Sequence, residues 1–525
     1  MIRIREISLP PEHNVAQLSY EAARALRVSP SKIRRVTIIR RSLDARKKPD
    51  VRYIYTIDVA VDGSENKILK QSGCKKAAIA ADKYYKVPKC DKNPTYRPVV
   101  VGFGPAGMFA ALTLAIAGLR PLVLERGEDA ATRHEKVQKF WQTGELDPKS
   151  NVQFGEGGAG TFSDGKLNTG VNNPRISWIL EQFVKAGARE DILFEAKPHV
   201  GTDVLLTVVQ NLRQRIISLG GEVRFCAQVT GLLQHNGKVT GLEINHNETI
   251  SCEQVIFAVG HSARDTFQYL QQAGIPLEAK PFAMGVRIEH PQATVDISQY
   301  GQLNPVLPPA DYKLVKHLSD RTVYTFCMCP GGYVVAAASE EGGVVTNGMS
   351  YADREGENAN SALLVTVNPK DFPTDDPLAG MYWQQEIERK AFAVGGGNYC
   401  APAQCVGDFL TGKPSVEAGA VKPTYRPGVT WCDLHTVLPS HITDALKEAL
   451  PQLNENLRGF ANPDAVLTAP ETRSSSPVRI VRDETRQSTA LLGFYPAGEG
   501  AGYAGGIMSA AIDGIQSAEA LMETL

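Results

Sequence analysis

Residues 97–107 read RPVVVGFGPAG, an apolar strand that runs into the pattern Gly102-x-Gly104-x-x-Gly107 and then into a helix-forming stretch, Met108 to Ala117. Glycines at this spacing let the backbone turn tightly and approach a pyrophosphate. The unpaired N–H groups and the positive dipole end of the following helix would bind that anion. The stretch therefore predicts a nucleotide-binding βα unit.

A second strand and an acid follow where such a unit requires them. PLVLE at residues 121–125 is apolar up to its last residue, and Glu125 follows Gly107 by 18 positions (125 − 107). An acid at this distance reaches a ribose hydroxyl of a bound dinucleotide. Strand, glycines, helix, strand and acid in this order predict an α/β, Rossmann-type domain.

Two distant segments favour FAD over NAD. VIFAVG at residues 255–260 resembles the ATG segment of flavoproteins of the two-dinucleotide type, with Val in place of Thr. YPAGEG at residues 495–500 resembles the last strand of those proteins, whose acid binds the ribityl chain; this chain has Glu499 where they usually have Asp. The stretch that begins at Gly505 predicts a helix with its N-terminus at the pyrimidine edge of the flavin, where it would stabilise the anionic reduced form.

The segment GEGGAGTFSDGKLN at residues 155–168 is rich enough in glycine to lie against a pyrophosphate and an isoalloxazine ring, and its Asp164, Lys166 and Asn168 could contact the ring. An ordinary glycine-rich turn is the alternative. The residues predicted to bind the cofactor are Gly102, Gly104, Pro105, Ala106, Gly107, Glu125, Arg126, Gly157, Gly158, Ala159, Gly160, Val229, Ala258, Gly260, Gly498, Glu499, Gly505, Gly506 and Ile507.

These segments, taken with FAVGHSARD, FCMCPGGYVVAAASEEGGVVTNGMSYADR, GGGNYCAPAQ and PETRSSSPVRI, resemble the predicted FAD-dependent dehydrogenase family of bacteria and plastids. The resemblance covers nearly the whole chain. It implies a glutathione-reductase-type FAD fold and oxidoreductase activity. It implies no substrate, because fold is poor evidence for reaction.

The order of patterns predicts four parts. Residues 1–95 predict a small N-terminal α+β module, and residues 96–281 the first part of the FAD-binding domain, with a β-meander over residues 222–260. Residues 282–465 predict an inserted substrate domain, and residues 466–525 the C-terminal part of the FAD-binding domain.

Composition indicates a soluble protein of the cytoplasm. The 525 residues carry 56 basic and 57 acidic side chains, so no protein-wide field attracts nucleic acid or a membrane surface. Neither a signal peptide nor a run of roughly 20 apolar residues is present. The nine cysteines show no disulfide framework and no set of four metal ligands, so we expect reduced thiols and no metal.

The source of electrons stays open. No Cys-x-x-Cys follows the first helix, which disfavours a disulfide mechanism, and no second strand–GxGxxG–helix unit marks a nicotinamide domain. NAD(P)H would therefore visit the flavin transiently, or another protein would donate electrons. We expect four polar residues in glycine- or proline-rich loops to meet the small-molecule substrate, with positive charge from the lysine and arginine: Lys166, Asn347, Asn398 and Arg473.

Two alternatives remain. The run from Arg40 to Lys48 carries five basic residues and could bind RNA, which would make the protein an FAD-dependent RNA-modifying enzyme. A solvated hairpin tip is the plainer interpretation, and the nearly neutral net charge makes nucleic acid an unfavoured partner. A non-catalytic flavoprotein that senses redox state is the other alternative.

Overall fold

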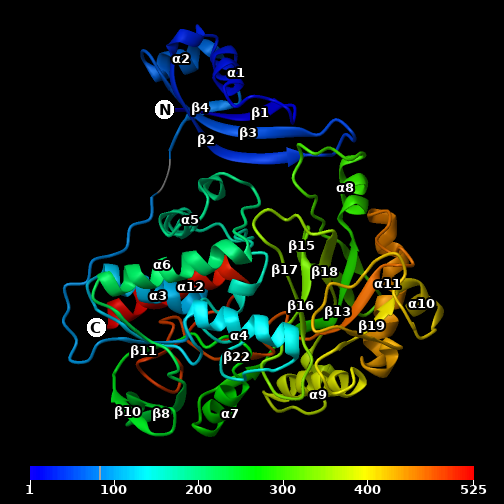
Figure 1. The fold of residues 1–525 in the computed structure, drawn as a ribbon. Coiled ribbons are helices and arrows are strands. Elements are labelled where there is room, and N and C mark those ends of the chain that lie inside the picture. The colour runs from blue at the N-terminus through cyan, green and yellow to red at the C-terminus, as the bar shows by residue number, and fades with distance from the viewer. Residues whose placement is uncertain (82–83) are drawn as a thin grey trace.

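The computed structural model describes residues 1–81 and 84–525. Its N-terminal module lies above the rest of the chain, and the long β2–β3 hairpin of this module reaches toward helix α8 (Figure 1). The remainder divides into a part built on a parallel sheet and a part built on a larger, mainly antiparallel sheet.

A five-stranded parallel sheet, in the order β23-β11-β5-β6-β7, organises the nucleotide-binding part. Val100 and Val123 face the covering helices, whereas Val99 and Val101 face a three-stranded meander, as alternation along a strand requires. The strands are β5 (Val99–Val101), β6 (Leu122–Leu124), β7 (Glu222–Arg224), β11 (Val255–Phe257) and β23 (Phe494–Pro496), and the meander is β8 (Val229–His235), β9 (Lys238–Ile244) and β10 (Glu248–Ser251).

This arrangement confirms the predicted Rossmann-type α/β class. One expected detail is wrong: residues 222–224 form an edge strand of the parallel sheet, and the meander begins only at Val229. The helices of this part are α3 (Pro105–Ile116), α4 (Ala130–Thr143), α5 (Arg175–Lys185), α6 (Thr202–Ser218), α7 (Arg264–Gln272) and α12 (Ile507–Thr524).

Helices α3 and α12 lie side by side on one face of the parallel sheet (Figure 1). Their close approach depends on Gly514, where a Cβ atom would lie 2.0 Å from the carbonyl oxygen of Ala106. The contact brings the N-termini of both helices to the same end of the sheet, the end at which its parallel strands terminate.

A seven-stranded sheet, in the order β14-β15-β18-β13-β21-β19-β20, organises the inserted part. Residues 466–471, expected to belong to the C-terminal part of the FAD-binding domain, lie in this sheet as β21. The strands are β13 (Phe282–Pro291), β14 (Val315–His317), β15 (Thr322–Cys329), β18 (Asn358–Val367), β19 (Ala401–Cys405), β20 (Val429–Trp431) and β21 (Val466–Glu471).

Helices and a short ribbon complete this part. The helices are α8 (Gln292–Tyr300), α9 (Ala379–Val394), α10 (Val406–Thr411) and α11 (Ser440–Asn456), and a ribbon pairs β16 (Tyr333–Ala336) with β17 (Thr346–Met349). A second ribbon, β12 (Leu277–Ala279) with β22 (Val478–Ile480), packs in the core of the nucleotide-binding part. Short 3₁₀ turns of the chain span Pro30–Lys32, Ala159–Phe162, Glu190–Leu193, Pro369–Asp371 and Leu434–Thr436.

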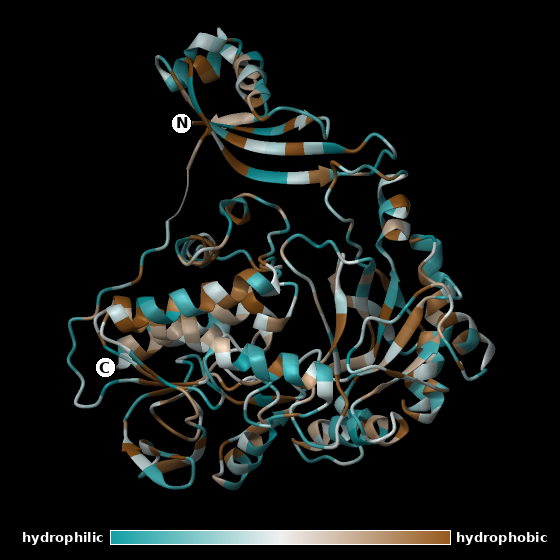
Figure 2. Cartoon of the chain, viewed as in Figure 1, coloured by the Kyte–Doolittle hydropathy of each residue, from teal (hydrophilic) through white to brown (hydrophobic). Residues whose placement is uncertain are grey.

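The N-terminal module is an antiparallel sheet, in the order β2-β3-β1-β4, with two helices. Hydrophobic and hydrophilic residues are mixed along β2 and β3 (Figure 2), and two register shifts in their pairing interrupt strict alternation on β2. The elements are β1 (Ile2–Leu9), α1 (Gln17–Leu26), β2 (Ile33–Asp44), β3 (Arg52–Val61), α2 (Glu65–Ser72) and β4 (Ala77–Ile79).

The hairpin of this module docks on both other parts. The backbone N–H of Arg41 donates to the Phe194 carbonyl at 2.7 Å, and the N–H of Ala196 donates to the Arg41 carbonyl at 2.8 Å, so β2 gains a short parallel bridge. Beyond the hairpin tip, Val51 is buried in the apolar core of the inserted part.

A buried cluster of charges ties the inserted part to the nucleotide-binding part. Glu388 of α9 is 1% exposed and accepts two hydrogen bonds of 2.9 Å from Arg264 of α7 and bonds of 3.0 and 2.8 Å from Arg473. Burial alone would raise the pKa of the Glu388 carboxyl, but the two guanidinium groups outweigh burial and lower its pKa to about 2.

None of the helices in the described residues is long and apolar enough to cross a membrane.

Replacing Glu388 by Gln is expected to lower the free energy of unfolding by about 3–5 kcal/mol at neutral pH, because two buried guanidinium groups lose their counter-charge. Urea denaturation followed by tryptophan fluorescence measures the effect. The difference in unfolding free energy between wild type and Glu388→Gln should shrink as pH falls from 4.5 toward about 2, because Glu388 itself takes up a proton there.

Glu340 provides a matched control, since it also binds Arg264, at 2.9 Å, but its side chain is 28% exposed. Glu340→Gln should cost less than about 1 kcal/mol. Equal losses in the two variants would show that the buried cluster does not hold the two parts together.

Candidate functional site

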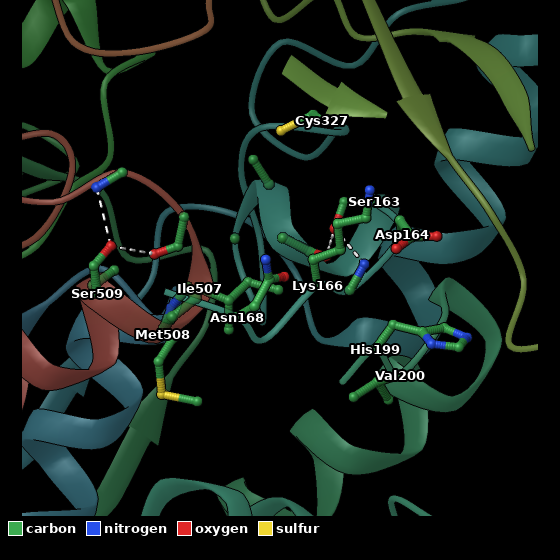
Figure 3. A pocket seen from close by; sticks show the side chains of 18 of the residues that line it. Ser163, Asp164, Lys166, Asn168, His199, Val200, Cys327, Ile507, Met508 and Ser509 are labelled. Carbon is green, nitrogen blue, oxygen red and sulfur yellow. Dashed lines mark hydrogen bonds between the residues drawn. The ribbon is translucent and has the colours of Figure 1, made fainter. Parts of the chain in front are cut away.

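A cavity of about 1080 Å³ lies between the two large sheets and the N-terminal hairpin. Its volume is at the upper end of the roughly 300–1,000 Å³ typical of ligand pockets. The residues that follow parallel strands β5, β6, β11 and β23 line it, which is the edge where open parallel sheets bind ligands. Figure 3 shows the start of α12 at one wall, with Ser163–Lys166 and Cys327 across from it.

The turn between β5 and α3 is built for close approach of a ligand to backbone. Gly102 has a φ of +90°, and a Cβ at Gly107 would lie 1.9 Å from the Gly102 carbonyl oxygen, so both glycines make the tight turn. At Gly104 the nearest atom to an added Cβ is 3.6 Å away, and this residue lines the cavity.

Both helix N-termini at the cavity are available to an anion. In the described residues no side chain caps α3, which starts after Gly104, or α12, which starts after Gly506. The first-turn N–H groups of a helix have no partners within the helix, and the dipole makes this end positive.

Glu125 lies at the end of β6 and is 5% exposed. Its carboxylate accepts hydrogen bonds from the backbone N–H groups of Phe103 at 2.7 Å and of Gly127 and Gly155 at 2.9 Å. Glu125 therefore fixes three segments that line or flank the cavity, a role the sequence did not predict. It also lines the cavity itself.

Arg126 extends the same wall. Its guanidinium donates to Asp265 at 2.9 and 3.0 Å and lies 4.3 Å from the centre of the Phe154 ring. Arg126 and Phe154 both line the cavity.

Glu499 lines the cavity near the start of α12. Its contacts are long: the Gly506 N–H donates to it at 3.5 Å, and Nδ1 of His261 lies 3.6 Å from Oε1. Burial raises the pKa of Glu499 to about 7. The carboxyl thus keeps hydrogen-bonding capacity for a ligand.

The cavity contains most of the predicted cofactor residues. Gly107 and Gly157 are exceptions: Gly107 makes the turn behind the wall, and the Gly157 N–H donates to the Phe103 carbonyl at 2.8 Å. The predicted residues that line it are Gly102, Gly104, Pro105, Ala106, Glu125, Arg126, Gly158, Ala159, Gly160, Val229, Ala258, Gly260, Gly498, Glu499, Gly505, Gly506 and Ile507.

The structure places three of the four predicted substrate residues at the cavity and one outside it. Lys166 and Asn347 line the cavity, and the Lys166 ammonium donates to the Met328 carbonyl. Arg473 also lines it, but Glu388 and Ser339 bind its guanidinium. Asn398 lies outside: it is exposed, and its side chain accepts from the Cys400 N–H in the loop that leads from α9 to β19.

Asp164, which the sequence analysis named as a possible contact of the ring, and several residues outside those predictions make up much of the far end of the cavity. Asp164 is 4% exposed and accepts bonds of 3.0 and 2.5 Å from Arg354, and both residues line the cavity. Glu471 and Cys327 line it from the inserted part. Arg354, Glu471 and Cys327 lie far apart in the chain, so no local motif indicates that they share one site.

The basic run from Arg40 to Lys48 takes part in docking the hairpin. Arg41 pairs with Glu195, Arg46 with Asp44, and the Lys48 ammonium donates to the Ser298 carbonyl. Arg41 also lines the cavity. Docking therefore uses Arg41 and Lys48, whereas Arg40, Arg46 and Lys47 remain exposed.

Comparisons with known proteins identify related domains and a full-length relative. Residues 281–474 match the family model described as "FAD-dependent protein, C-terminal domain-like", and residues 1–60 match a domain of unknown function. An uncharacterized protein of Clostridium beijerinckii is 47% identical over 527 residues, 99% of this chain and 98% of that protein. The chain belongs to the family of this relative, and its residues 281–474 are similar to the C-terminal domain of FAD-dependent proteins.

Solved structures are more distant. A geranylgeranyl bacteriochlorophyll reductase-like protein of Thermoplasma acidophilum is 14% identical, with 82% of this chain and 78% of that chain covered and a TM-score of 0.36. A glycine oxidase of Bacillus cereus is 12% identical, with 82% and 98% covered and a TM-score of 0.34. Likeness at this level assigns no reaction.

Glu125→Gln is expected to lower the free energy of unfolding by about 1–3 kcal/mol, because the amide NH₂ group then opposes backbone N–H donors that the carboxylate had satisfied. Thermal and urea denaturation of the protein freed of ligand measure the loss. Glu499→Gln is the control, since its contacts are long, and its stability should stay near wild type. Matching losses in both variants would contradict the structural role of Glu125.

Proposed function

We propose that the protein is an FAD-dependent oxidoreductase that exchanges a hydride between the flavin and a small organic substrate. The observation that carries the proposal is the cavity wall of open glycines after β11 and at the N-terminus of α12, beside the glycine turn that starts α3. Added Cβ atoms at Gly260, Gly505 and Gly506 would meet no atom within 4 Å, so this wall leaves room for a ligand against the backbone.

The residues fit an extended dinucleotide. The pyrophosphate would bind at the N-terminus of α3 beside Gly104, where N–H groups and dipole favour an anion. Glu125 would hold the adenosine ribose and Glu499 the ribityl chain. The N-terminus of α12 would lie at the pyrimidine edge of the ring and stabilise negative charge there.

When bound, the flavin would supply the hydride acceptor and donor, and the protein would position the substrate and exclude water. Lys166 and Asn347 line the cavity beyond the glycine wall. The Lys166 ammonium binds one carbonyl oxygen, so its charge is available to an anionic substrate or to the reduced flavin. The amide of Asn347 would orient the substrate.

Gly104→Leu is expected to yield a folded, colourless protein. A Cβ at this residue meets its nearest neighbour at 3.6 Å, so the backbone tolerates a side chain, while the rest of Leu would occupy the space of the pyrophosphate. Flavin absorbance per mole of purified protein measures occupancy. Gly170→Leu, at a surface site with no atom within 4 Å, should keep its full flavin content. A fully yellow Gly104→Leu protein would contradict the proposed pyrophosphate site.

An anaerobic absorption spectrum before and after addition of NADH or NADPH tests the electron source. Bleaching of the flavin band would support transient visits of a nicotinamide nucleotide. Bleaching by dithionite alone would support a protein donor. A bound flavin that turns over with no donor and acceptor pair would contradict an oxidoreductase and favour the redox-sensing alternative.

A further inference from the structure

Glu471 is a buried acid at the wall of the cavity with half of its carboxyl group unpaired. It is 4% exposed and ends β21, from which the chain crosses back toward the nucleotide-binding part. Arg287 of β13 donates to Oε1 at 3.3 Å. Oε2 is shielded from water and has no hydrogen-bond partner in the part of the chain that the structure describes.

The chain beyond Glu471 leads directly to the proposed flavin site. Ser474 lines the cavity, and the hydroxyl of Ser476 donates to the Gly500 carbonyl at 3.2 Å, next to Glu499. Glu471 therefore lies where the glycine wall meets the end of the cavity formed by the inserted part.

Strand irregularities surround Glu471. The pairing of β13 with β21 shifts between Gly285 and Arg287, and the pairing of β15 with β18 shifts between Phe326 and Cys329. Cys327, inside the second irregularity, has a φ of +41° and lines the cavity. Irregularities of this kind occur beside active sites, where they redirect side chains.

Because Oε2 of Glu471 has no partner and is shielded from water, the protonated carboxyl is favoured over the carboxylate. Burial raises the pKa of Glu471 to about 7, and Arg287 opposes this only in part. The other charged or titratable groups around it are Arg287, Cys327, Cys329, Lys166 and the Glu388–Arg473 pair.

His261, which also lines the cavity, and Glu388 each keep one protonation state near neutral pH. Burial lowers the pKa of His261 to about 3, so its imidazole stays neutral. The charges of Arg264 and Arg473 keep Glu388 ionised. A general acid works best with a pKa near the operating pH, and Glu471 meets this requirement.

We propose that Glu471 exchanges a proton with the substrate, and that the substrate class is a polarised carbonyl or imine together with its reduced alcohol or amine. The inference rests on the proposed function, since reduced flavin supplies the hydride. In reduction the substrate carbon gains that hydride and its two electrons, the oxygen or nitrogen gains the proton of Oε2, and Glu471 is left as a carboxylate beside Arg287. Oxidation reverses each transfer.

The first test follows the visible spectrum of the oxidised holoprotein between about pH 5 and pH 9, because a charge that appears beside the flavin shifts its bands. We expect a titration near pH 7 in wild type that is reduced in Glu471→Gln to the contribution of Glu499, whose pKa burial also raises to about 7. Glu289→Gln is the matched control: Glu289 is fully buried with a pKa also raised to about 7 by burial, but its carboxyl binds Asn358 and Thr424. That variant should retain the flavin titration.

The second test reoxidises the reduced holoprotein with a panel of small aldehydes, ketones and imines, or with ferricyanide, which takes electrons without a proton. Glu471→Gln should slow the first reaction by about 10²-fold or more and leave the second unchanged. The inference would be overturned if Glu471→Gln left the flavin titration unchanged or slowed both reactions equally. It would also be overturned if the reduced wild-type protein reacted normally with ferricyanide but with none of the carbonyls and imines. Wild-type protein purified without flavin would instead refute the proposed function before either test begins.

Discussion

The carboxylate of Glu125 is the constraint on which the nucleotide end of the cavity depends. A buried charge is costly unless hydrogen bonds satisfy it, and here three backbone N–H groups do so, from Phe103, Gly127 and Gly155. The glycine turn after β5, the residue after β6 and the start of the glycine-rich segment are therefore held together before a ligand binds. A preformed site spares the ligand much of the entropy cost of ordering loops.

The nucleotide end could be predicted because its determinants are local. Strand, glycines, helix and acid lie within residues 97–125, and steric rules fix the shape of such a unit whatever surrounds it. The boundary at residue 466 could not be predicted in this way. An apolar strand such as β21 fits either sheet, and its pairing with β13 and β19 decides the outcome.

The substrate end was harder to predict, because glycine marks several kinds of loop. Gly395 to Gly397 end α9 and redirect the chain into β19, so Asn398 beside them serves the turn and not the cavity. Arg473 does reach the cavity, but a long-range partner, Glu388, binds its charge. No local sequence pattern indicated a role for Glu471, because the groups that surround its carboxyl come from distant parts of the chain.

The two ends of the cavity therefore differ in how they are built. A continuous βα unit and one carboxylate shape the nucleotide end, whereas the far end exists only when three parts of the chain meet. The Glu388 cluster fixes two of these parts, and the backbone bridge between Arg41 and residues 194–196 adds the third. Because Arg41 and Glu195 both line the cavity, the N-terminal hairpin forms part of its wall. Under the proposed function, changes in that hairpin would alter which substrate is accepted and leave the proposed nucleotide site intact.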